Sequence, residues 1–217
     1  MSEIPPLDQI ELDRWFEANQ VLLETVYLQG ITPWQQSGFG LHTPHTAEQW
    51  RAHRQPIAEC VDRSGSFLDI GCANGYLLEC LLAWTSERGL SIDPYGLDLS
   101  SALIALARER LRMYAGQLWV ANAWNWMPPR RFTWVRTELV YVPDALHSPY
   151  VDHLLDHYLA PGGRLLVCEY RGRSDSRQTL DIDDYLSSLG KTVDFIRAGS
   201  WEGREVVRVS VLTSGNH

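Results

Sequence analysis

Apolar residues near the N-terminus recur at mixed helical spacing, which predicts an amphipathic helix over residues 7–28. Gly30 and Pro33 end this pattern. The next segment, 34–45, is punctuated by glycine and proline and is rich in aromatic residues, which is typical of a loop. We expect residues 1–62 to form a helical cap over the rest of the chain.

A second helix is expected from Thr46 to Val61. Thr46 fits the N-cap, because its hydroxyl can accept a bond from a free N–H of the first turn. Glu48 or Gln49 stands near the position at which a capping box returns that bond.

From residue 63 to residue 217, short apolar runs alternate with helix-like segments, and valine-rich runs close the chain. This alternation predicts an α/β fold, a seven-stranded and mostly parallel sheet with helices on both faces, in a single domain of 1–217. A turn at 93–94 is expected to lead into the second strand. The expected strands are 67–70, 95–98, 117–121, 131–140, 164–170, 192–198 and 205–213, and the expected helices are 75–88, 101–113, 149–159 and 180–189.

Two glycines lie between the first strand and the helix that follows it. Gly71 and Gly75 allow a close approach of the backbone to a ligand and turn angles that side chains forbid. The inner glycine of a pyrophosphate fingerprint is missing, and no Lys-Ser or Lys-Thr pair follows, so a dinucleotide or P-loop site is disfavoured. Asp98, at the end of the next strand, can accept both hydroxyls of a ribose. The pattern predicts a site for a nucleoside without phosphates; the alternative is a glycine turn that serves packing alone.

Three segments together resemble the motifs of a known family. The run 68–75 (LDIGCANG) is similar to motif I of the class I S-adenosylmethionine-dependent methyltransferases. The run 96–100 (GLDLS) resembles their acidic motif on the second strand, and 159–165 (LAPGGRL) resembles the turn before their fifth strand. The three match in type, order and approximate spacing over about residues 66–170, and they imply a Rossmann-like core with S-adenosyl-L-methionine as the cofactor.

The resemblance also implies which residues hold the cofactor. One position departs from the family: Asn122 stands where an acid commonly accepts the adenine amino group, and its amide oxygen can accept that bond without charge assistance. Trp124 can stack on the adenine. The expected cofactor-binding residues are Asp69, Gly71, Cys72, Ala73, Asn74, Gly75, Asp98, Leu99, Asn122, Ala123, Trp124 and Glu138.

The tip of the fourth strand is where the transferred methyl group would lie in the resembled fold. Motifs of base-directed amino methylation, of arginine methylation and of a cysteine nucleophile are absent there. Glu138, Tyr141 and His147 are the candidate catalytic residues. His147 has the ordinary pKa of a general base, and Glu138 can orient it or bind a cationic substrate. The alternatives are that Glu138 contacts the methionine part of the cofactor, that His147 lies on the surface, and that no base is used.

Aromatic and histidine side chains ahead of the glycine loop are candidate walls of a substrate pocket, because such segments often fold over the site in the resembled family. The alternative is that they pack the helices onto the sheet. The candidates are Tyr27, Trp34, Phe39, His42, His45 and Trp50, joined by Tyr141 from the fourth strand tip.

Composition bears on partners and on compartment. The formal charge of −8 argues against long contacts with a phosphate backbone, although Arg130, Arg131, Arg171 and Arg173 leave a local basic patch open. Four widely spaced cysteines support neither a zinc site nor a disulfide framework, so no metal is expected. No signal peptide or membrane-spanning run is present, which indicates a soluble, cytoplasmic protein.

Taken together, these features predict an S-adenosylmethionine-dependent methyltransferase that acts on a small molecule, such as an aromatic or amine-bearing metabolite. Neither DNA nor RNA nor a membrane is expected as a partner. Two alternatives remain open: a methyltransferase directed at RNA or protein, and a non-catalytic module that binds S-adenosylmethionine.

Overall fold

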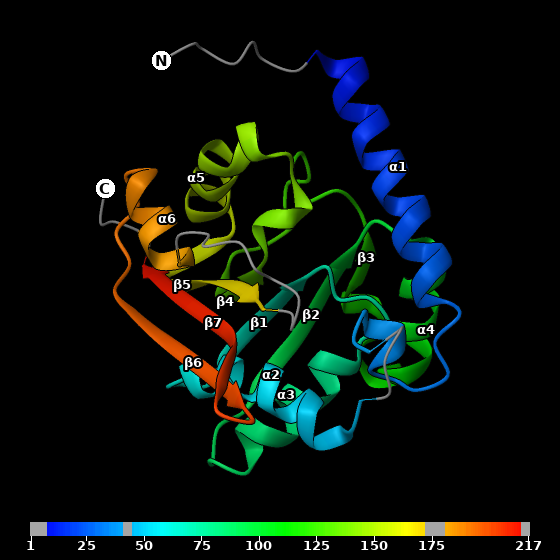
Figure 1. The fold of residues 1–217 in the computed structure, drawn as a ribbon, viewed down its shortest axis with the longest axis vertical. Helices are drawn as coiled ribbons and strands as arrows, with labels where there is room; N and C mark the ends of the chain where they lie inside the picture. The colour runs from blue at the N-terminus through cyan, green and yellow to red at the C-terminus, as the bar shows by residue number, and fades with distance from the viewer. Residues whose placement is uncertain (1–7, 41–44, 172–180, 214–217) are drawn as a thin grey trace.

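The computed structural model describes residues 8–40, 45–171 and 181–213. In these residues, seven strands form one sheet in the order β3-β2-β1-β4-β5-β7-β6 (Figure 1). The five strands from β3 to β5 run parallel, and β7 is antiparallel to both of its neighbours. The strands are β1 (Gly65–Ile70), β2 (Ile92–Asp98), β3 (Leu118–Val120), β4 (Phe132–Thr137), β5 (Leu159–Tyr170), β6 (Phe195–Trp201) and β7 (Arg204–Thr213).

Helices cover both faces of the sheet, as the sequence predicts (Figure 1). Helices α2, α3 and α4 share one apolar core with the sheet, and α5 and α6 share the other together with α1. The α helices are α1 (Gln9–Tyr27), α2 (Ala47–Cys60), α3 (Tyr76–Ser86), α4 (Ser101–Arg110), α5 (His147–His157) and α6 (Ile182–Ser188), and the short 3-10 turns are η1 (Gln35–Ser37), η2 (Arg112–Gln117), η3 (Leu139–Tyr141) and η4 (Asp144–Leu146).

Local sequence sets where the N-terminal helices begin. Helix α2 starts with a capping box, in which Thr46 Oγ accepts from Gln49 N at 3.2 Å and Gln49 Oε1 accepts from Thr46 N at 2.9 Å. Asp8 caps α1 with one bond, because its carboxylate accepts from Glu11 N at 2.8 Å. These bonds satisfy N–H groups that the first turn of a helix leaves without partners. The capping box expected at Thr46 is therefore confirmed, with Gln49 as the second partner.

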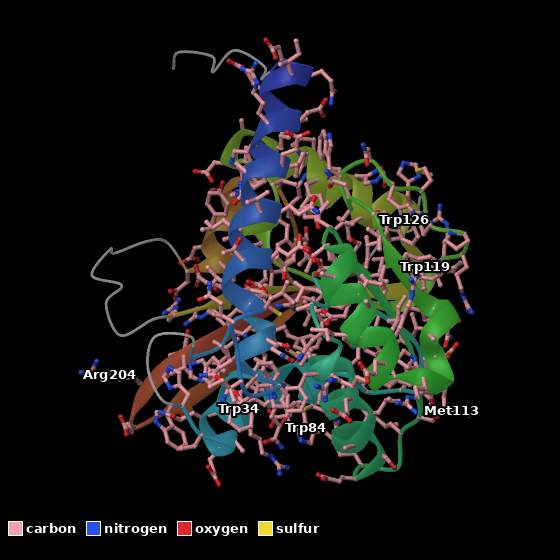
Figure 2. All side chains as sticks on the ribbon, turned by 90° about the vertical axis from the view of Figure 1, so that its right-hand side faces the viewer. Trp34, Trp84, Met113, Trp119, Trp126 and Arg204 are labelled. Carbon is pink, nitrogen blue, oxygen red and sulfur yellow. The ribbon has the colours of Figure 1, made fainter. Side chains whose placement is uncertain are left out.

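Large aromatic side chains fill much of both cores. Trp134 and Tyr158 are fully buried on opposite sides of the sheet. Trp119, on the edge strand β3, lies with its ring 5.2 Å from that of Trp126 (Figure 2). Tyr158 holds Trp126 in place, because its hydroxyl donates to the backbone oxygen of Trp126.

Several predicted boundaries are shifted: β5, for example, begins at Leu159 rather than at 164, and α4 ends at Arg110 rather than at 113. Two other shifts have a clear cause. The turn expected at 93–94 lies inside β2, where Pro94 pairs with Phe67 of β1. Strand β3 begins opposite Gly96, so β2 has only one neighbour at the level of the proline, and there a missing N–H is tolerated. Strand β4 ends at Thr137 rather than at 140, because the chain turns into η3 directly after Glu138.

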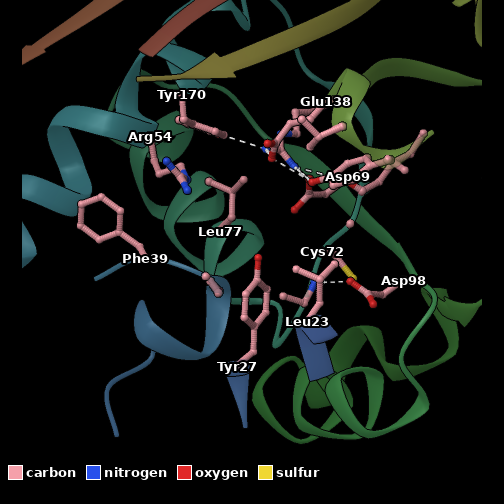
Figure 3. A pocket seen from close by; sticks show the side chains of 18 of the residues that line it. Leu23, Tyr27, Phe39, Arg54, Asp69, Cys72, Leu77, Asp98, Glu138 and Tyr170 are labelled. Carbon is pink, nitrogen blue, oxygen red and sulfur yellow. Dashed lines mark hydrogen bonds and ion pairs between the residues drawn. The ribbon is translucent and has the colours of Figure 1, made fainter. Parts of the chain in front are cut away.

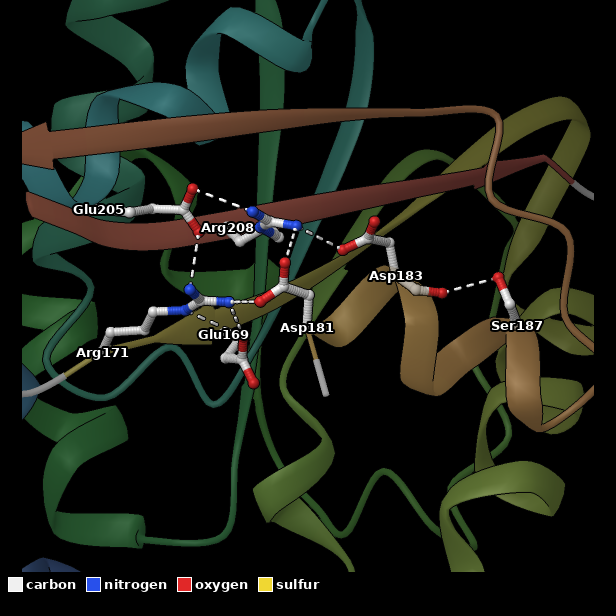
Figure 4. Close-up of polar contacts among 7 residues, drawn as sticks. All are labelled: Glu169, Arg171, Asp181, Asp183, Ser187, Glu205 and Arg208. Carbon is white, nitrogen blue, oxygen red and sulfur yellow. Dashed lines mark hydrogen bonds and ion pairs between the residues drawn. The ribbon is translucent and has the colours of Figure 1, made fainter. Parts of the chain in front are cut away.

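Arginines near the ends of β5 and β7 are held in a network of ion pairs (Figure 4). Arg171 pairs with Glu169 at 3.1 Å and with Glu205 at 3.3 Å, and it also contacts Asp181. Arg208 also pairs with two of these three acids, Asp181 and Glu205. Arg171 is thus neutralised locally, which weakens the basic patch that its sequence position leaves open. The remaining cation of that patch on this side, residue 173, lies outside the described residues.

No helix in the described ranges is long and apolar enough to cross a membrane. All four cysteines are free thiols, and Cys60, Cys72 and Cys168 are buried.

Candidate active site

The glycine loop between β1 and α3 has the strained backbone that its sequence predicts. Gly71 and Gly75 have φ angles of 72° and 75°, and Ala73 between them has a φ of 47°. A Cβ at Gly71 would collide with the ring of Tyr141, so this position excludes other residues on two grounds. Gly71 N and Cys72 N both donate to Leu97 O, at 2.7 and 3.0 Å, which ties the loop to the end of β2.

Asp98 lies at the end of β2, beside the glycine loop. One carboxylate oxygen accepts from Ala73 N and the other from Ser100 N, each at 2.9 Å. Burial raises the pKa of Asp98, and these backbone bonds oppose the rise. A carboxylate oxygen can accept more than one hydrogen bond, and Asp98 lines the pocket, so the residue fits a ribose diol.

The end of β3 supplies the residues expected at the adenine. Asn122, Ala123 and Trp124 all line the pocket. Asn122 Oδ1 accepts from Trp124 N at 3.0 Å and so fixes a turn. The backbone oxygen of Ala123 accepts from Tyr158 Oη, which holds this turn against the core. Trp124 stands half-buried in this turn.

A buried arginine, Arg136, organises the tips of β1, β4 and β5, and Figure 3 shows three of its partners, Asp69, Glu138 and Tyr170. Arg136 is 2% exposed and donates to Asp69 Oδ1 at 3.2 Å, to Tyr141 Oη at 3.0 Å and to Tyr170 Oη at 3.0 Å. It also pairs with Glu138, whose carboxylate accepts from Tyr141 Oη at 2.8 Å. Asp69 and Arg136 are register partners in the β1–β4 ladder, so strand pairing brings these charges together.

This cluster of Asp69, Arg136, Glu138, Tyr141 and Tyr170, the strand-tip cluster, carries two carboxylates for one guanidinium. Burial raises the pKa of Asp69 to about 6, although the Arg136 charge opposes the rise. Burial also raises the pKa of Tyr141 well above its ordinary value, so the phenol keeps its proton. Glu138 is held by its bonds to Arg136 and Tyr141 and lines the pocket, where its negative charge can attract a cation.

The structure brings Glu138 and Tyr141 together but places His147 elsewhere. His147 begins α5 and is not part of the pocket lining. Its Nδ1 lies 2.9 Å from Tyr185 Oη, and its Nε2 lies 3.6 Å from the exposed Asp144. Burial lowers the pKa of His147. His147 was expected to lie beside Glu138. The turns η3 and η4 lie between the two residues along the chain, and His147 contacts Tyr185 instead.

The N-terminal segment forms one wall of the pocket. Tyr27 and Phe39 line it, together with His45 and Trp50. Trp34 does not, since it packs toward the ring of Tyr76 at 6.4 Å. His42 lies outside the described residues. The predicted wall is therefore present in part.

Asn74 fastens this wall to the glycine loop, although neither it nor Gly75 lines the pocket. Asn74 is fully buried, and its amide donates to Pro33 O at 3.0 Å. Its carbonyl accepts from Ser37 Oγ at 2.6 Å and from Tyr76 N at 3.2 Å. The sequence places Asn74 against the cofactor, whereas the contacts give it a structural task behind the loop.

The pocket has a volume of about 1040 Å³ and two ends. One end has Asp98, Asn122 and Trp124, which we call the donor end. At the other end, which we call the aromatic end, lie Phe39, Trp50, Arg54 and Tyr170. Figure 3 shows Phe39, Arg54 and Tyr170 across the pocket from Asp98.

Sequence reasoning missed Arg54 and Arg136 as site residues. Arg136 had a signal, because a charged residue directly follows the mostly apolar run of 132–135 within the expected strand. Arg54 had none, because a single arginine in a mixed helix is ordinary.

The mostly parallel sheet, the glycine loop after β1 and the acid at the end of β2 define a class I S-adenosylmethionine-dependent methyltransferase. A solved Burkholderia thailandensis 1,6-didemethyltoxoflavin-N1-methyltransferase has the same fold, with a TM-score of 0.65 and 14% identity over 97% of this chain and 92% of that one. No model of a known protein family matches the chain.

Curated relatives give the finer placement. A tRNA U34 carboxymethyltransferase of Pseudomonas fluorescens (strain SBW25) is 30% identical over 98% of this chain and 70% of its own length. One of Ectopseudomonas mendocina is 28% identical over 96% of this chain and 70% of its own length. The chain belongs to the tRNA U34 carboxymethyltransferase family. The expected class and its cofactor, S-adenosylmethionine, are confirmed.

The expectation of a small-molecule acceptor is wrong, and so is the expectation that RNA is not a partner. Both are overturned by the relatives, which match nearly the whole chain and are named for a tRNA substrate. The error has a physical source. A net charge of −8 sums over the entire surface, whereas a contact with RNA depends on where individual cations lie.

Proposed function

We propose that this protein transfers a methyl group from S-adenosylmethionine to a nucleoside in RNA, with the uridine at position 34 of a tRNA as the acceptor. The observation that carries the proposal is membership of a family named for that substrate. In this transfer the methyl–sulfur bond breaks and its electron pair stays on sulfur. A bond forms from the acceptor atom to the methyl carbon, and the acceptor gives up a proton.

The size and lining of the pocket support a base as the acceptor. Pockets for a single drug-sized ligand hold about 300–1,000 Å³, and this one has about 1040 Å³, enough for a donor and a base. Enzymes that modify a base insert it into a pocket, where aromatic side chains stack on it. Tyr170 is half-buried and can offer such a face at the aromatic end, whereas Phe39 and Trp50 are buried beside it.

The charge of the strand-tip cluster supports transfer of an uncharged methyl group. By resemblance, the transferred group lies at the tip of β4, where Arg136 is already bonded to Asp69 and Glu138. Two carboxylates with one cation attract a sulfonium and repel a further carboxylate. A second candidate, transfer of a carboxymethyl group, is supported by the names of the relatives.

The test is incubation of the purified protein with radiolabelled S-adenosylmethionine and a tRNA transcript, followed by counting of label in the RNA. A matched transcript with cytidine in place of the uridine at position 34 is the control. Label in the first transcript alone is the expected result. Label that appears in neither RNA, or equally in both, would contradict the proposal. Mass spectrometry of the digested nucleosides then separates a methyl from a carboxymethyl product.

A further inference from the structure

Arg54, on the inner side of α2, is a buried cation without a counter-charge. It is only 7% exposed, yet no carboxylate among the described residues lies within ion-pair distance. Its one hydrogen bond is a long contact of 3.5 Å from Nη1 to His53 O. Its guanidinium carbon lies 3.6 Å from the ring centre of Tyr170, 4.7 Å from that of Trp50 and 5.6 Å from that of Phe39.

In this arrangement most N–H donors of the Arg54 guanidinium form no hydrogen bond with the described residues. An arginine has five N–H donors in a planar fork that matches the oxygens of a phosphate or carboxylate. Burying a cation is costly, and ring faces offset only part of that cost. Arg54 lines the pocket, so a ligand there can supply the missing anion. The contrast is Arg136, which is equally buried but bonded to two carboxylates.

The position of Arg54 assigns the anion to the acceptor. Figure 3 shows Arg54 between Phe39 and Tyr170, across the pocket from Asp98 at the donor end. The acids Asp69, Asp98 and Glu138 line the rest of this region and repel a phosphate. A nucleotide that stacks its base on Tyr170, the half-buried ring of the aromatic end, brings its phosphate to the same end of the pocket.

We propose that Arg54 binds a phosphate of the acceptor nucleotide at the aromatic end of the pocket, an inference that rests on the proposed RNA acceptor. Arg54 is then a specificity-determining residue, because it admits an anionic nucleotide into a pocket whose other charges are mostly acidic. The rings of Phe39, Trp50 and Tyr170 hold the guanidinium in place for that contact.

The test is calorimetric titration of the protein, saturated with S-adenosylhomocysteine, with uridine monophosphate and, separately, with uridine. The wild type is expected to bind the monophosphate at least about tenfold more tightly, as a charge-assisted bidentate contact implies. Arg54→Gln removes this preference, and Arg54→Lys keeps part of it. Arg51→Gln is the matched control, because Arg51 is an exposed arginine on the same helix and pairs with Glu87.

Three results would overturn the inference. One is equal affinity of the wild type for the two compounds, which includes no binding of either. Another is a phosphate preference that survives in Arg54→Gln. The third is a loss of about tenfold or more in the affinity of Arg54→Gln for S-adenosylhomocysteine, because Arg54 then serves the carboxylate of the donor. Thermal unfolding of each variant verifies that it folds.

The test of the Arg54 anion site and the test of the RNA acceptor can fail independently. A phosphate preference that depends on Arg54, in a protein that labels no tRNA, supports the anion site and refutes the RNA acceptor. Labelling of tRNA by a protein whose Arg54→Gln variant binds both compounds like the wild type refutes the anion site alone.

Discussion

Asn74→Ala tests how the N-terminal wall is attached to the glycine loop. The substitution removes bonds of the Asn74 side chain to Pro33 O, Ser37 Oγ, Gln36 Oε1 and Tyr76 N, at distances from 2.6 to 3.3 Å. Asn74 is fully buried, so solvent does not replace these bonds directly. At about 1 kcal/mol for each bond, the free energy of unfolding should fall by about 3–4 kcal/mol. For a chain of this length the midpoint of thermal unfolding falls by on the order of 10 °C.

The assay is urea and thermal unfolding of the wild type and the variant, together with calorimetric titration of S-adenosylhomocysteine. Affinity should fall as well, because the wall that contains Tyr27 and Phe39 loses its attachment to the loop. Asn125→Ala is the matched control, since Asn125 is exposed, and it should change the free energy of unfolding by less than about 0.5 kcal/mol. A loss below about 1 kcal/mol in Asn74→Ala would refute the assigned role, because it is what a single hydrogen bond contributes.

Three further predictions follow from the same site. Asp98→Ala should weaken binding of S-adenosylhomocysteine by more than about tenfold in calorimetry, and unchanged affinity would remove the ribose assignment. Gly71→Ala should abolish that binding or prevent folding, as followed by circular dichroism, because a Cβ collides with Tyr141 and the φ of 72° is strained. Burial raises the pKa of Asp69 from 3.8 to about 6, so the folded state binds a proton that the unfolded state releases. Its contribution to stability therefore rises as the pH falls through about 6 toward about 4, by up to about 3 kcal/mol. In urea titrations over this range, the difference in unfolding free energy between the wild type and Asp69→Asn should change by that amount, and a constant difference would contradict the shifted pKa.

The residues that the sequence identifies well are those whose role depends on the backbone. Gly71 and Gly75 are required by positive φ angles, and Asp98 by its place at a strand end, and both kinds of requirement show in a local pattern. The seven-stranded sheet follows in the same way from alternating runs, and it is confirmed. The end of β4 was misplaced because the chain turns into a 3-10 segment there, and the start of β2 was misplaced because the strand tolerates a proline.

Roles that depend on which strands and helices meet could not be predicted locally. Asp69 and Arg136 become partners only because β1 and β4 are neighbours in register. Arg54 gains its importance from Tyr170 on β5, a contact across more than half of the chain. His147 has the chemistry of a base in sequence, yet α5 directs it toward Tyr185. The acceptor was missed for a similar reason, since composition reports the amount of charge and not its place.

The distribution of charge in the pocket gives the two ligands separate places. At the donor end and the strand tips, Asp69, Asp98 and Glu138 outnumber Arg136, so the local field favours a sulfonium. The same acids repel a phosphate. Arg54 faces the same pocket without a carboxylate partner among the described residues. Under the two proposals above, the cationic donor and the anionic acceptor bind at opposite ends without competing, and we expect their reactive groups to meet between these ends, beside the β4 tip.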